Sequence, residues 1–518
     1  MTREAAAIGA GLAPARTARP ILSGERIHVV GIAGAGASAA ALLAHDAGAI
    51  VTGCDAGGPS PYTPALEAAG VPMSWEHDPR HVTTSPGPAR LAVTKALTAV
   101  DPDHPELRAA RTAGIPLEPW QQLVADAAVG RTLIAVAGTH GKSTTAGWLV
   151  HVLVEAGLDP AAFVGALLPS SLTGGPPATA RAGLGAPFVV EADEYAGNFD
   201  VFRPDLAVLT NAEWDHPDVF ADREAVLDAF AGWLRGAPDG ATVIANVGDE
   251  GTATILERLL PDRPLAIVVY ALTDADPQRG GFLRGLAERF ESDGRRATPL
   301  LGRIVAADPD GSTLELHGLN ALPGPRRVRL RTAGRHNAAN ALAVAGAAMA
   351  LGVAPDAIVA GLERFDGVSR RLERKGEASG VAVYDDYGHH PTAIRETIAA
   401  VRQREPGRRV WAVYEPLTYH RTAALLPAFA EALATADAVA VADIWAGRDP
   451  DTTVASAAGL ADAVRGLRPA LTVAAPGSVD ATADWLAGEV RAGDAVLVMG
   501  GGHSYRIADG LLQRLSEG

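Results

Sequence analysis

The stretch "VAGTHGKSTTAG", Val136–Gly147, decides the fold class of this chain. An apolar strand is expected over 133–137, and an apolar helix is expected from the Lys-Ser pair to about residue 155. A full P-loop has four residues between its first Gly and the Gly-Lys pair, whereas this loop has only two. The order of strand, glycine loop and helix predicts an α/β domain that binds a nucleotide.

The short loop keeps the physical requirements for binding phosphate. Backbone N–H groups at a helix N-terminus point at an anion, and the helix dipole favours negative charge there. Lys142 can neutralise the β- and γ-phosphates, and the Ser143 hydroxyl can bind Mg²⁺. The alternative is a glycine-rich turn with an exposed lysine. The predicted ATP-binding residues of this segment are Gly138, Thr139, His140, Gly141, Lys142, Ser143 and Thr144.

Two further apolar strands run into acidic segments, "VVEADEYAGNFD" and "LTNAEWDHPDVF". Because the carboxyl ends of parallel strands meet at one edge of a sheet, these side chains should lie beside the phosphate loop. Mg²⁺ prefers hard oxygen ligands and keeps several waters. We therefore predict that Glu191 and His216 hold the metal together with Ser143. The alternative is a pair of solvated acidic loops.

A glycine-rich turn, "GIAGAG" at 31–36, follows an expected strand and precedes a helix expected to start near Ser38. Such a turn binds NAD(P), a nucleotide sugar or nothing, so a dehydrogenase remains an alternative at this point. Asp55, at the end of the next strand, could accept a hydrogen bond from a ribose or a uracil. The residues predicted for a nucleotide-sugar site are Gly34, Ala35, Gly36 and Asp55.

Strands and helices alternate again in the last third of the chain, which predicts another doubly wound domain. Before it, Asn337 and Asn340 share a helix face and could bind an adenine or ribose edge; helix capping is the alternative. Arg371 is either a phosphate contact or a charged helix end. The segment "DDYGHHPT" contains His389 and His390 after a strand, without the cysteine or helical histidine spacing of a zinc site.

Composition limits the other classes of function. The 518-residue chain has a formal charge of −15, which argues against nucleic acid or an anionic membrane as a default partner. Cys54 is the only cysteine, so no intramolecular disulfide is possible, as expected in a reducing cytoplasm. Residues 1–25 lack the apolar segment of a signal peptide, and no run approaches the roughly 18 apolar residues of a membrane span. We expect a flexible N-terminal tail on a cytoplasmic protein.

As an ordered set, these motifs resemble the Mur ligase family, the ATP-dependent amino-acid ligases of peptidoglycan synthesis. The resemblance runs from about Arg26 to Arg514 and includes "GRHNAANALA", "FDGVSRRLE", "YEPLTYHRT" and "VLVMGGGHSYRIA". It implies three α/β domains. These are a Rossmann-like UDP-sugar domain over 26–129, a central P-loop ATPase domain with a mostly parallel sheet over 130–362, and a Rossmann-like domain over 363–518 that closes on ATP.

The resemblance also implies the reaction. The carboxylate of UDP-N-acetylmuramate attacks the γ-phosphate of ATP, and the amine of an amino acid then displaces phosphate from the acyl phosphate. L-alanine is the amino acid in the branch that this chain resembles most, and a recycled murein tripeptide is the alternative amine. Mg²⁺ is the implied metal, and the protein would be a monomer or homodimer. The implied catalytic residues are Lys142, Glu191, His216, Arg371 and His389, and those facing the amino acid are Tyr387, His389, His390 and Arg421.

Some positions depart from the family pattern. Ala33 and Ala37 replace a glycine and a methionine of the first loop, and Glu415 and its neighbours replace the usual "QPHRYSRT" start. No lysine lies between Lys142 and Lys375, so a carbamylated lysine that bridges metal, as in related ligases, is not expected.

Overall fold

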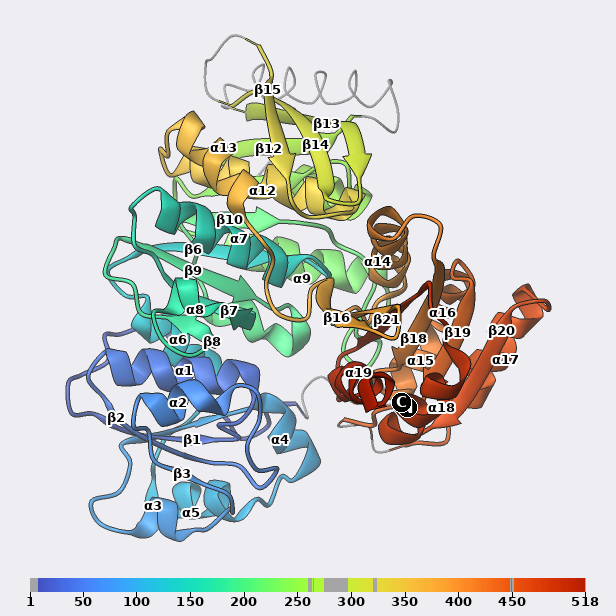
Figure 1. Ribbon diagram of the computed structural model, residues 1–518. Helices are drawn as coiled ribbons and strands as arrows, with labels where there is room; N and C mark the ends of the chain where they lie inside the picture. The colour runs from blue at the N-terminus through green and yellow to red at the C-terminus, as the bar shows by residue number, and fades with distance from the viewer. Residues whose placement is uncertain are drawn as a thin grey trace.

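The computed structural model describes residues 8–259, 263, 265–273, 297–319, 324–447, 449 and 451–517. These residues form three α/β domains, each built around its own sheet. In Figure 1 the N-terminal sheet lies at the bottom, the central sheet above it and the C-terminal sheet to the right. The three-domain α/β architecture expected from the motifs is therefore confirmed.

The N-terminal sheet is entirely parallel and has the strand order β3-β2-β1-β4-β5, the order of a dinucleotide-binding fold without its sixth strand. Its strands are β1 Arg26–Val30, β2 Ile50–Cys54, β3 Met73–Ser74, β4 Arg90–Val93 and β5 Leu117–Pro119. Its helices are α1 Ala35–Asp46, α2 Thr63–Ala68, α3 Arg80–Thr83, α4 Lys95–Val100, α5 Pro105–Ala113 and α6 Trp120–Ala127.

Two predictions for this part of the chain are wrong. Helix α1 begins at Ala35, not near Ser38; the buried Ser38 hydroxyl donates to the Ala35 carbonyl inside the helix. Residues 8–25 do not form a free tail, because Arg16 donates to both Glu118 and Asp126 and the Ile21 side chain is buried. Residues 1–7 of the predicted tail lie outside the described part of the chain.

The central sheet has ten strands in the order β15-β14-β13-β12-β11-β10-β6-β9-β7-β8. It is parallel from β13 to β7 and antiparallel at both edges. Its strands are β6 Thr132–Ala137, β7 Ala161–Leu168, β8 Ala178–Arg181, β9 Pro187–Ala192, β10 Leu206–Leu209, β11 Thr242–Asn246, β12 Ala266–Leu272, β13 Ala297–Asp308, β14 Gly311–His317 and β15 Arg326–Leu330.

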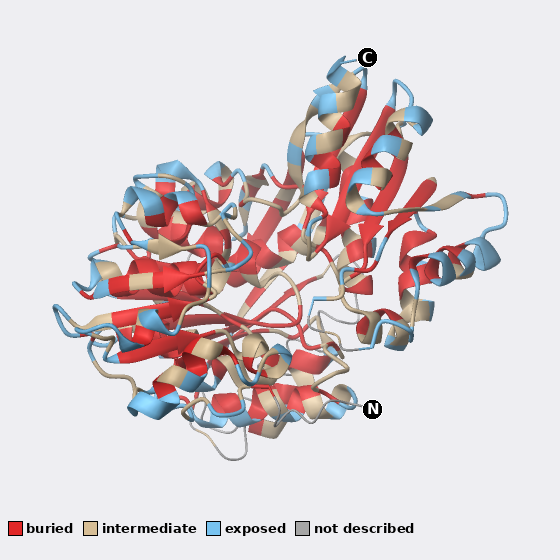
Figure 2. Ribbon diagram, turned by 90° about the horizontal axis from the view of Figure 1, so that it is seen from below, coloured by how far each residue is buried: buried red, intermediate tan, exposed pale blue. Residues whose placement is uncertain are grey.

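Helices cover both faces of this sheet. They are α7 Lys142–Glu155, α8 Ser170–Thr173, the 3-10 segment η2 Tyr195–Val201, α9 Arg223–Arg235, α10 Glu250–Leu259, α12 Arg335–Ala350 and α13 Pro355–Arg364. The strands at the centre of the sheet, β6, β9 and β10, are buried along nearly their whole length and read as mostly apolar runs, as expected for a covered parallel sheet. Figure 2 shows this buried layer running toward the junction of the domains.

The C-terminal sheet has the order β16-β17-β21-β18-β19-β20 and is parallel except at β16. Its strands are β16 Glu373–Ala378, β17 Val381–Asp386, β18 Arg409–Glu415, β19 Ala438–Ala442, β20 Thr472–Gly477 and β21 Asp494–Gly500. Its helices are α14 Pro391–Arg404, α15 Tyr419–Ala424, α16 Leu426–Leu433, α17 Ala457–Leu467, α18 Val479–Glu489 and α19 Tyr505–Glu517. Across the described ranges, we find no helix with both the length and the apolar character to cross a bilayer.

Candidate active site

The loop between β6 and α7 wraps tightly at two glycines with positive φ. Gly138 has φ of 144°, and a Cβ there would overlap the Thr210 hydroxyl. Gly141 has φ of 82°, and a Cβ there would lie 2.9 Å from Asn340 Oδ1. Glycine at both positions therefore lets the loop approach its neighbours closely and leaves the first amides of α7 at the cavity wall.

Lys142 lies among carboxylates at the start of α7. Its Nζ is 3.0 Å from Glu194 Oε2 and 3.8 Å from Asp193 Oδ1. Burial alone would lower the pKa of Lys142, but Glu194, Asp193 and Glu191 outweigh burial and raise it. Burial raises the pKa of Glu194 to about 7 despite the lysine beside it. The ammonium is therefore charged at neutral pH and available to a phosphate.

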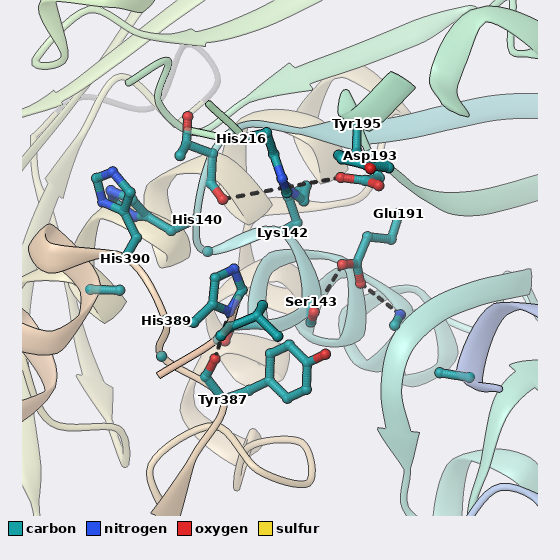
Figure 3. A pocket seen from close by; sticks show the side chains of 18 of the residues that line it. His140, Lys142, Ser143, Glu191, Asp193, Tyr195, His216, Tyr387, His389 and His390 are labelled. Atoms are coloured by element: carbon teal, nitrogen blue, oxygen red, sulfur yellow. Dashed lines mark hydrogen bonds and ion pairs between the residues drawn. The ribbon is translucent and has the colours of Figure 1, made fainter. Parts of the chain in front are cut away.

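Ser143 lies between Glu191 of the central domain and Arg371, which follows that domain in the chain. Its hydroxyl lies 3.0 Å from Glu191 Oε1 (Figure 3). The same hydroxyl accepts a hydrogen bond of 2.7 Å from Arg371 Nη2. The other Glu191 oxygen accepts from the Gly165 amide at 2.6 Å. A Cβ on Gly165 would come within 2.9 Å of this carboxylate, so the close approach requires glycine. A hydroxyl beside an oriented carboxylate is a donor set that fits Mg²⁺.

The predicted metal ligands fall into two groups rather than one. Glu191 contacts Ser143, whereas the ligand atoms of His216, Asp193 and Glu194 lie within 4.8 Å of one another. Lys142 contacts the second group through Asp193 and Glu194. His216 is held with a φ of 53°, unusual for a residue other than glycine. Asp193 and Glu194 were visible in the acidic segment but were not among the predicted metal ligands.

The two asparagines of α12 lie against the phosphate loop. Asn340 Nδ2 donates to Asn337 Oδ1 at 3.3 Å, and Asn337 Nδ2 donates to the Ala333 carbonyl at 2.8 Å. Both side chains line the cavity. The Ala333 contact ties Asn337 to a backbone carbonyl just before the helix, whereas an N-cap would accept from a backbone N–H. The Asn340 amide oxygen faces Gly141.

The N-terminal loop lines the opposite part of the same cavity, with Gly34, Ala35, Gly36 and Asp55. The Asp55 carboxylate accepts from the Ala33 amide at 3.1 Å and from the Gly57 amide at 2.9 Å. Asp55 therefore shapes the turn as well as facing the cavity. A Cβ on Gly36 would overlap the Trp120 ring, so this glycine permits the packing of α1 on α6.

The C-terminal domain contributes Tyr387 and His389 through the loop after β17. The Tyr387 ring lies under the Arg371 guanidinium, 4.8 Å from its carbon. His389 Nδ1 lies 2.9 Å from the Tyr387 carbonyl, which can only accept, so Nδ1 carries the proton and Nε2 the lone pair. Burial lowers the pKa of His389 well below its usual range. The ring is thus a neutral imidazole in the cavity wall.

His390 and His140 connect the domains through Glu213. His140 Nε2 lies 2.8 Å from Glu213 Oε1, and Thr392 donates to Glu213 Oε2 at 2.6 Å. His390 is the N-cap of α14: Nδ1 accepts from the Thr392 amide at 3.4 Å, and Nε2 lies 3.3 Å from the Trp214 carbonyl. Glu213 was not among the predicted site residues, although it lies in the acidic segment, because its partners come from a distant helix.

Arg421 is buried and engaged by the central domain. Its Nε donates to Asp215 Oδ1 at 2.7 Å, and its Nη2 pairs with Asp215 Oδ2. Arg421 lies in the cavity wall. Two of its nitrogens are used in the contact between the domains, and its role on the amino-acid side stays a prediction. Asp215 was also missed as a partner, since no local pattern marks an ion pair spanning 206 positions.

One cavity of about 1150 Å³ is lined by side chains from all three domains. This volume exceeds the roughly 300–1000 Å³ of a usual site for one small ligand. The cavity brings together residues 139–144 of the predicted loop, the asparagine pair and Arg371, with the glycine turn on one side and Tyr387, His389, His390 and Arg421 on the other; the predicted Gly138 is not among its lining residues. The arrangement suits a reaction that joins more than one bound substrate.

Comparison with known proteins gives the family. The descriptions "Mur ligase family, catalytic domain", "Mur ligase middle domain" and "Mur ligase, glutamate ligase domain" match residues 26–132, 136–348 and 370–502. A UDP-N-acetylmuramate–L-alanine ligase of Kineococcus radiotolerans is 37% identical over 95% of this chain and 96% of its own length. The chain belongs to the Mur ligase family.

Solved Mur ligase structures agree with this fold. The UDP-N-acetylmuramate-alanine ligase of Thermotoga maritima aligns with a TM-score of 0.74 and 23% identity, over 95% of this chain and 99% of that one. The murein peptide ligase of Psychrobacter arcticus 273-4 aligns with a TM-score of 0.69 and 25% identity, over 95% and 99%. The first likeness shows the fold of this Mur ligase and nothing more.

Proposed function

We propose that this Mur ligase joins L-alanine to the carboxylate of UDP-N-acetylmuramate with cleavage of ATP to ADP and phosphate. The observation that carries the proposal is the single cavity in which the phosphate loop, the N-terminal glycine turn and His389 all face one space. The full-length similarity to ligases that carry this name supports the choice of substrates. ATP and a nucleotide sugar as substrates would place the reaction in the cytoplasm.

In the first step, a sugar carboxylate oxygen attacks the γ-phosphorus, and the bond to the β-phosphate oxygen breaks. Lys142 and the first amides of α7 bind the phosphates and stabilise the charge that moves to ADP. Arg371, 2.7 Å from the Ser143 hydroxyl, adds a second cation at the same place. Asn337 and Asn340 are proposed to contact the nucleotide, and Gly34, Gly36 and Asp55 to contact the UDP-sugar.

Ser143, Glu191 and His216 are the residues proposed to hold Mg²⁺, with Asp193 and Glu194 added by the structure. When bound, the metal would neutralise phosphate charge. The Glu191 carboxylate, oriented by the Gly165 amide, is positioned for this role without rearrangement.

In the second step, the amine attacks the acyl carbon and phosphate leaves. We propose that the lone pair on His389 Nε2 accepts a hydrogen bond from that amine, because Nδ1 is used by the Tyr387 carbonyl. Arg421 and His390 shape this end of the cavity through Asp215 and Glu213. The contact of α14 with the central domain keeps water from the acyl phosphate when the domains are docked.

The test is phosphate release by the purified protein with Mg-ATP and UDP-N-acetylmuramate. L-alanine, glycine, L-serine and the murein tripeptide are added one at a time. Release that requires both the sugar and L-alanine supports the proposal, and release that ignores L-alanine contradicts it.

A tripeptide ligase is the second candidate, favoured by the 25% identity to the murein peptide ligase over nearly the whole chain. It would be supported by release with the sugar and tripeptide but not with any single amino acid. Nicotinamide-dependent turnover, the dehydrogenase alternative, would leave the phosphate loop without a role.

A further inference from the structure

A second cluster of chemically active side chains lies inside the N-terminal domain, and none of its four members lines the large cavity. It consists of His28 on β1, Cys54 at the end of β2, His81 on α3 and Glu106 on α5. One ligand atom from each lies within 4.8 Å of the others. In Figure 1 these four elements meet in the lower part of the molecule. Nothing in the proposed ligase reaction uses them.

The spacing of the four side chains is close to that of a tetrahedral metal site. Glu106 Oε2 lies 3.1 Å from Cys54 Sγ and 3.3 Å from His28 Nε2, and Glu106 Oε1 lies 2.9 Å from His81 Nδ1. Bonds of 2.0–2.3 Å around zinc separate tetrahedral ligands by roughly 3.3–3.8 Å. Outward shifts of a few tenths of an ångström in these side chains would therefore accommodate an ion.

His28 is oriented toward the cluster by a neighbour outside it. Its Nδ1 lies 2.8 Å from the Thr52 hydroxyl. Its Nε2 faces Glu106 outside hydrogen-bond geometry and has no hydrogen-bond partner in the described part of the chain. The residue is only 2% exposed, so no bulk water satisfies that nitrogen. A second group that holds one ring nitrogen and leaves the other free is the usual support of a metal-binding histidine.

Charge also favours a cation here. Among the residues that the structure describes, the ion-pair partners of the fully buried Glu106 are His28, His77 and His81, with neither lysine nor arginine among them. The core therefore contains a carboxylate whose charge no fixed cation balances.

Two more imidazoles adjoin the cluster. His77 Nδ1 lies 3.2 Å from Cys54 Sγ, and the His104 ring packs edge-on to His77 at 4.4 Å. Among the described residues, both ring nitrogens of the buried His104 lack hydrogen-bond partners. Such a concentration of nitrogen and sulfur donors matches zinc rather than magnesium or calcium.

We propose that His28, Cys54, His81 and Glu106 form a closed structural zinc site. Binding replaces the thiol proton of Cys54, which passes to solvent, by a bond from sulfur to the metal. Four protein ligands leave no open position for catalysis, so the ion would cross-link β1, β2, α3 and α5 beneath the glycine turn.

The test uses cobalt as the probe, with the purified full-length protein first dialysed against a chelator. Co²⁺ bound to a thiolate gives a sulfur-to-cobalt charge-transfer band in the near ultraviolet. Because Cys54 is the only cysteine, metal bound at the ATP site cannot produce this band. We expect about one Co²⁺ per chain to produce it and about one Zn²⁺ to abolish it. His81→Ala and Glu106→Gln should weaken Co²⁺ binding at least about tenfold. Cys54→Ser should weaken Co²⁺ binding by a similar factor and should also abolish the charge-transfer band.

The exposed His317 provides the matched control, and His317→Ala should leave the titration unchanged. A folded parent protein that shows no band at excess Co²⁺ would overturn the proposal. So would an unchanged band in both His81→Ala and Glu106→Gln, because the thiol would then bind metal outside the cluster. These two variants keep the cysteine and decide the matter even where Cys54→Ser fails to fold.

Discussion

Replacing Glu415 by glutamine should stabilise the C-terminal domain at high pH. Glu415 ends β18, is only 2% exposed, and its Oε2 has no hydrogen-bond partner among the described residues. Burial raises its pKa to about 7, and the backbone amides of Ser504 and His503 offset this only in part. The family pattern that this segment resembles begins with glutamine here. The amide keeps the shape of the side chain and removes the charge.

The magnitude follows from the pKa. A rise from 4.5 to about 7 is roughly 2.5 units, and each unit corresponds to about 1.36 kcal/mol. The folded state holds this proton more tightly than the unfolded state, so the stability it contributes is complete below pH 4.5 and is lost as the pH rises through 7. At pH 8 the ionised carboxylate should cost at most about 3 kcal/mol. For a domain of this size that is roughly 6–12 °C in Tm.

The assay is thermal unfolding of wild type, Glu415→Gln and the exposed control Glu431→Gln at pH 5, 6, 7 and 8. The difference in Tm between Glu415→Gln and wild type should increase by several degrees from pH 5 to pH 8. The difference in Tm between Glu431→Gln and wild type should stay near zero. A Glu415→Gln difference that does not change between pH 5 and pH 8 would refute the reasoning.

Three other variants test the active site. Lys142→Ala should lower kcat at least about 10²-fold. UDP-sugar binding, measured by calorimetry, should be retained, because Lys142 and the proposed UDP-sugar site belong to different domains. Retained ADP production would contradict the assignment of the phosphate loop. His389→Ala should raise the KM for the amino acid more than that for ATP in steady-state kinetics, and equal losses would indicate a structural role. Asp215→Asn leaves the buried Arg421 without its carboxylate partner. With the domains docked, this change should lower the free energy of unfolding by about 3–5 kcal/mol, which is measured as a decrease in Tm. The exposed bidentate pair Arg402–Asp437 is the control, and Asp437→Asn should cost about 1 kcal/mol or less; equal losses in the two variants would count against the domain contact.

Local patterns in the sequence were sufficient to predict many helices and strands, but not which side chains pair between domains. The loop Gly138–Ser143 and the strand before it could be predicted, because the glycines, the lysine and the apolar run are adjacent in sequence. The pairing of Arg421 with Asp215 could not, since it depends on how two domains dock. The helix start at Ala35 was missed because Ser38 has the residue type of an N-cap, while the actual N-cap, Gly34, has no side chain that could mark it.

The metal ligands expected from the sequence stay a prediction, and their grouping could not be predicted for the same reason. Glu191 lies near the end of β9 and His216 follows β10, the strands on either side of β6, so the sequence pattern already indicated that both lie at one edge of the sheet. Which carboxylate faces which cation depends on side-chain direction after the strand ends. That direction pairs Glu191 with Ser143 and joins His216 to the group around Lys142.

The segment before β1 has a practical meaning for anyone who trims this protein. Similarity to the family begins at Arg26, and a shortened chain starting there would lack Arg16. Asp126 and Glu118, both almost fully buried, would then share Arg90 alone, with one more negative than positive charge in a dry place. Such a truncation, though it removes only residues that the family model leaves unmatched, should produce a protein that is harder to express and quicker to aggregate.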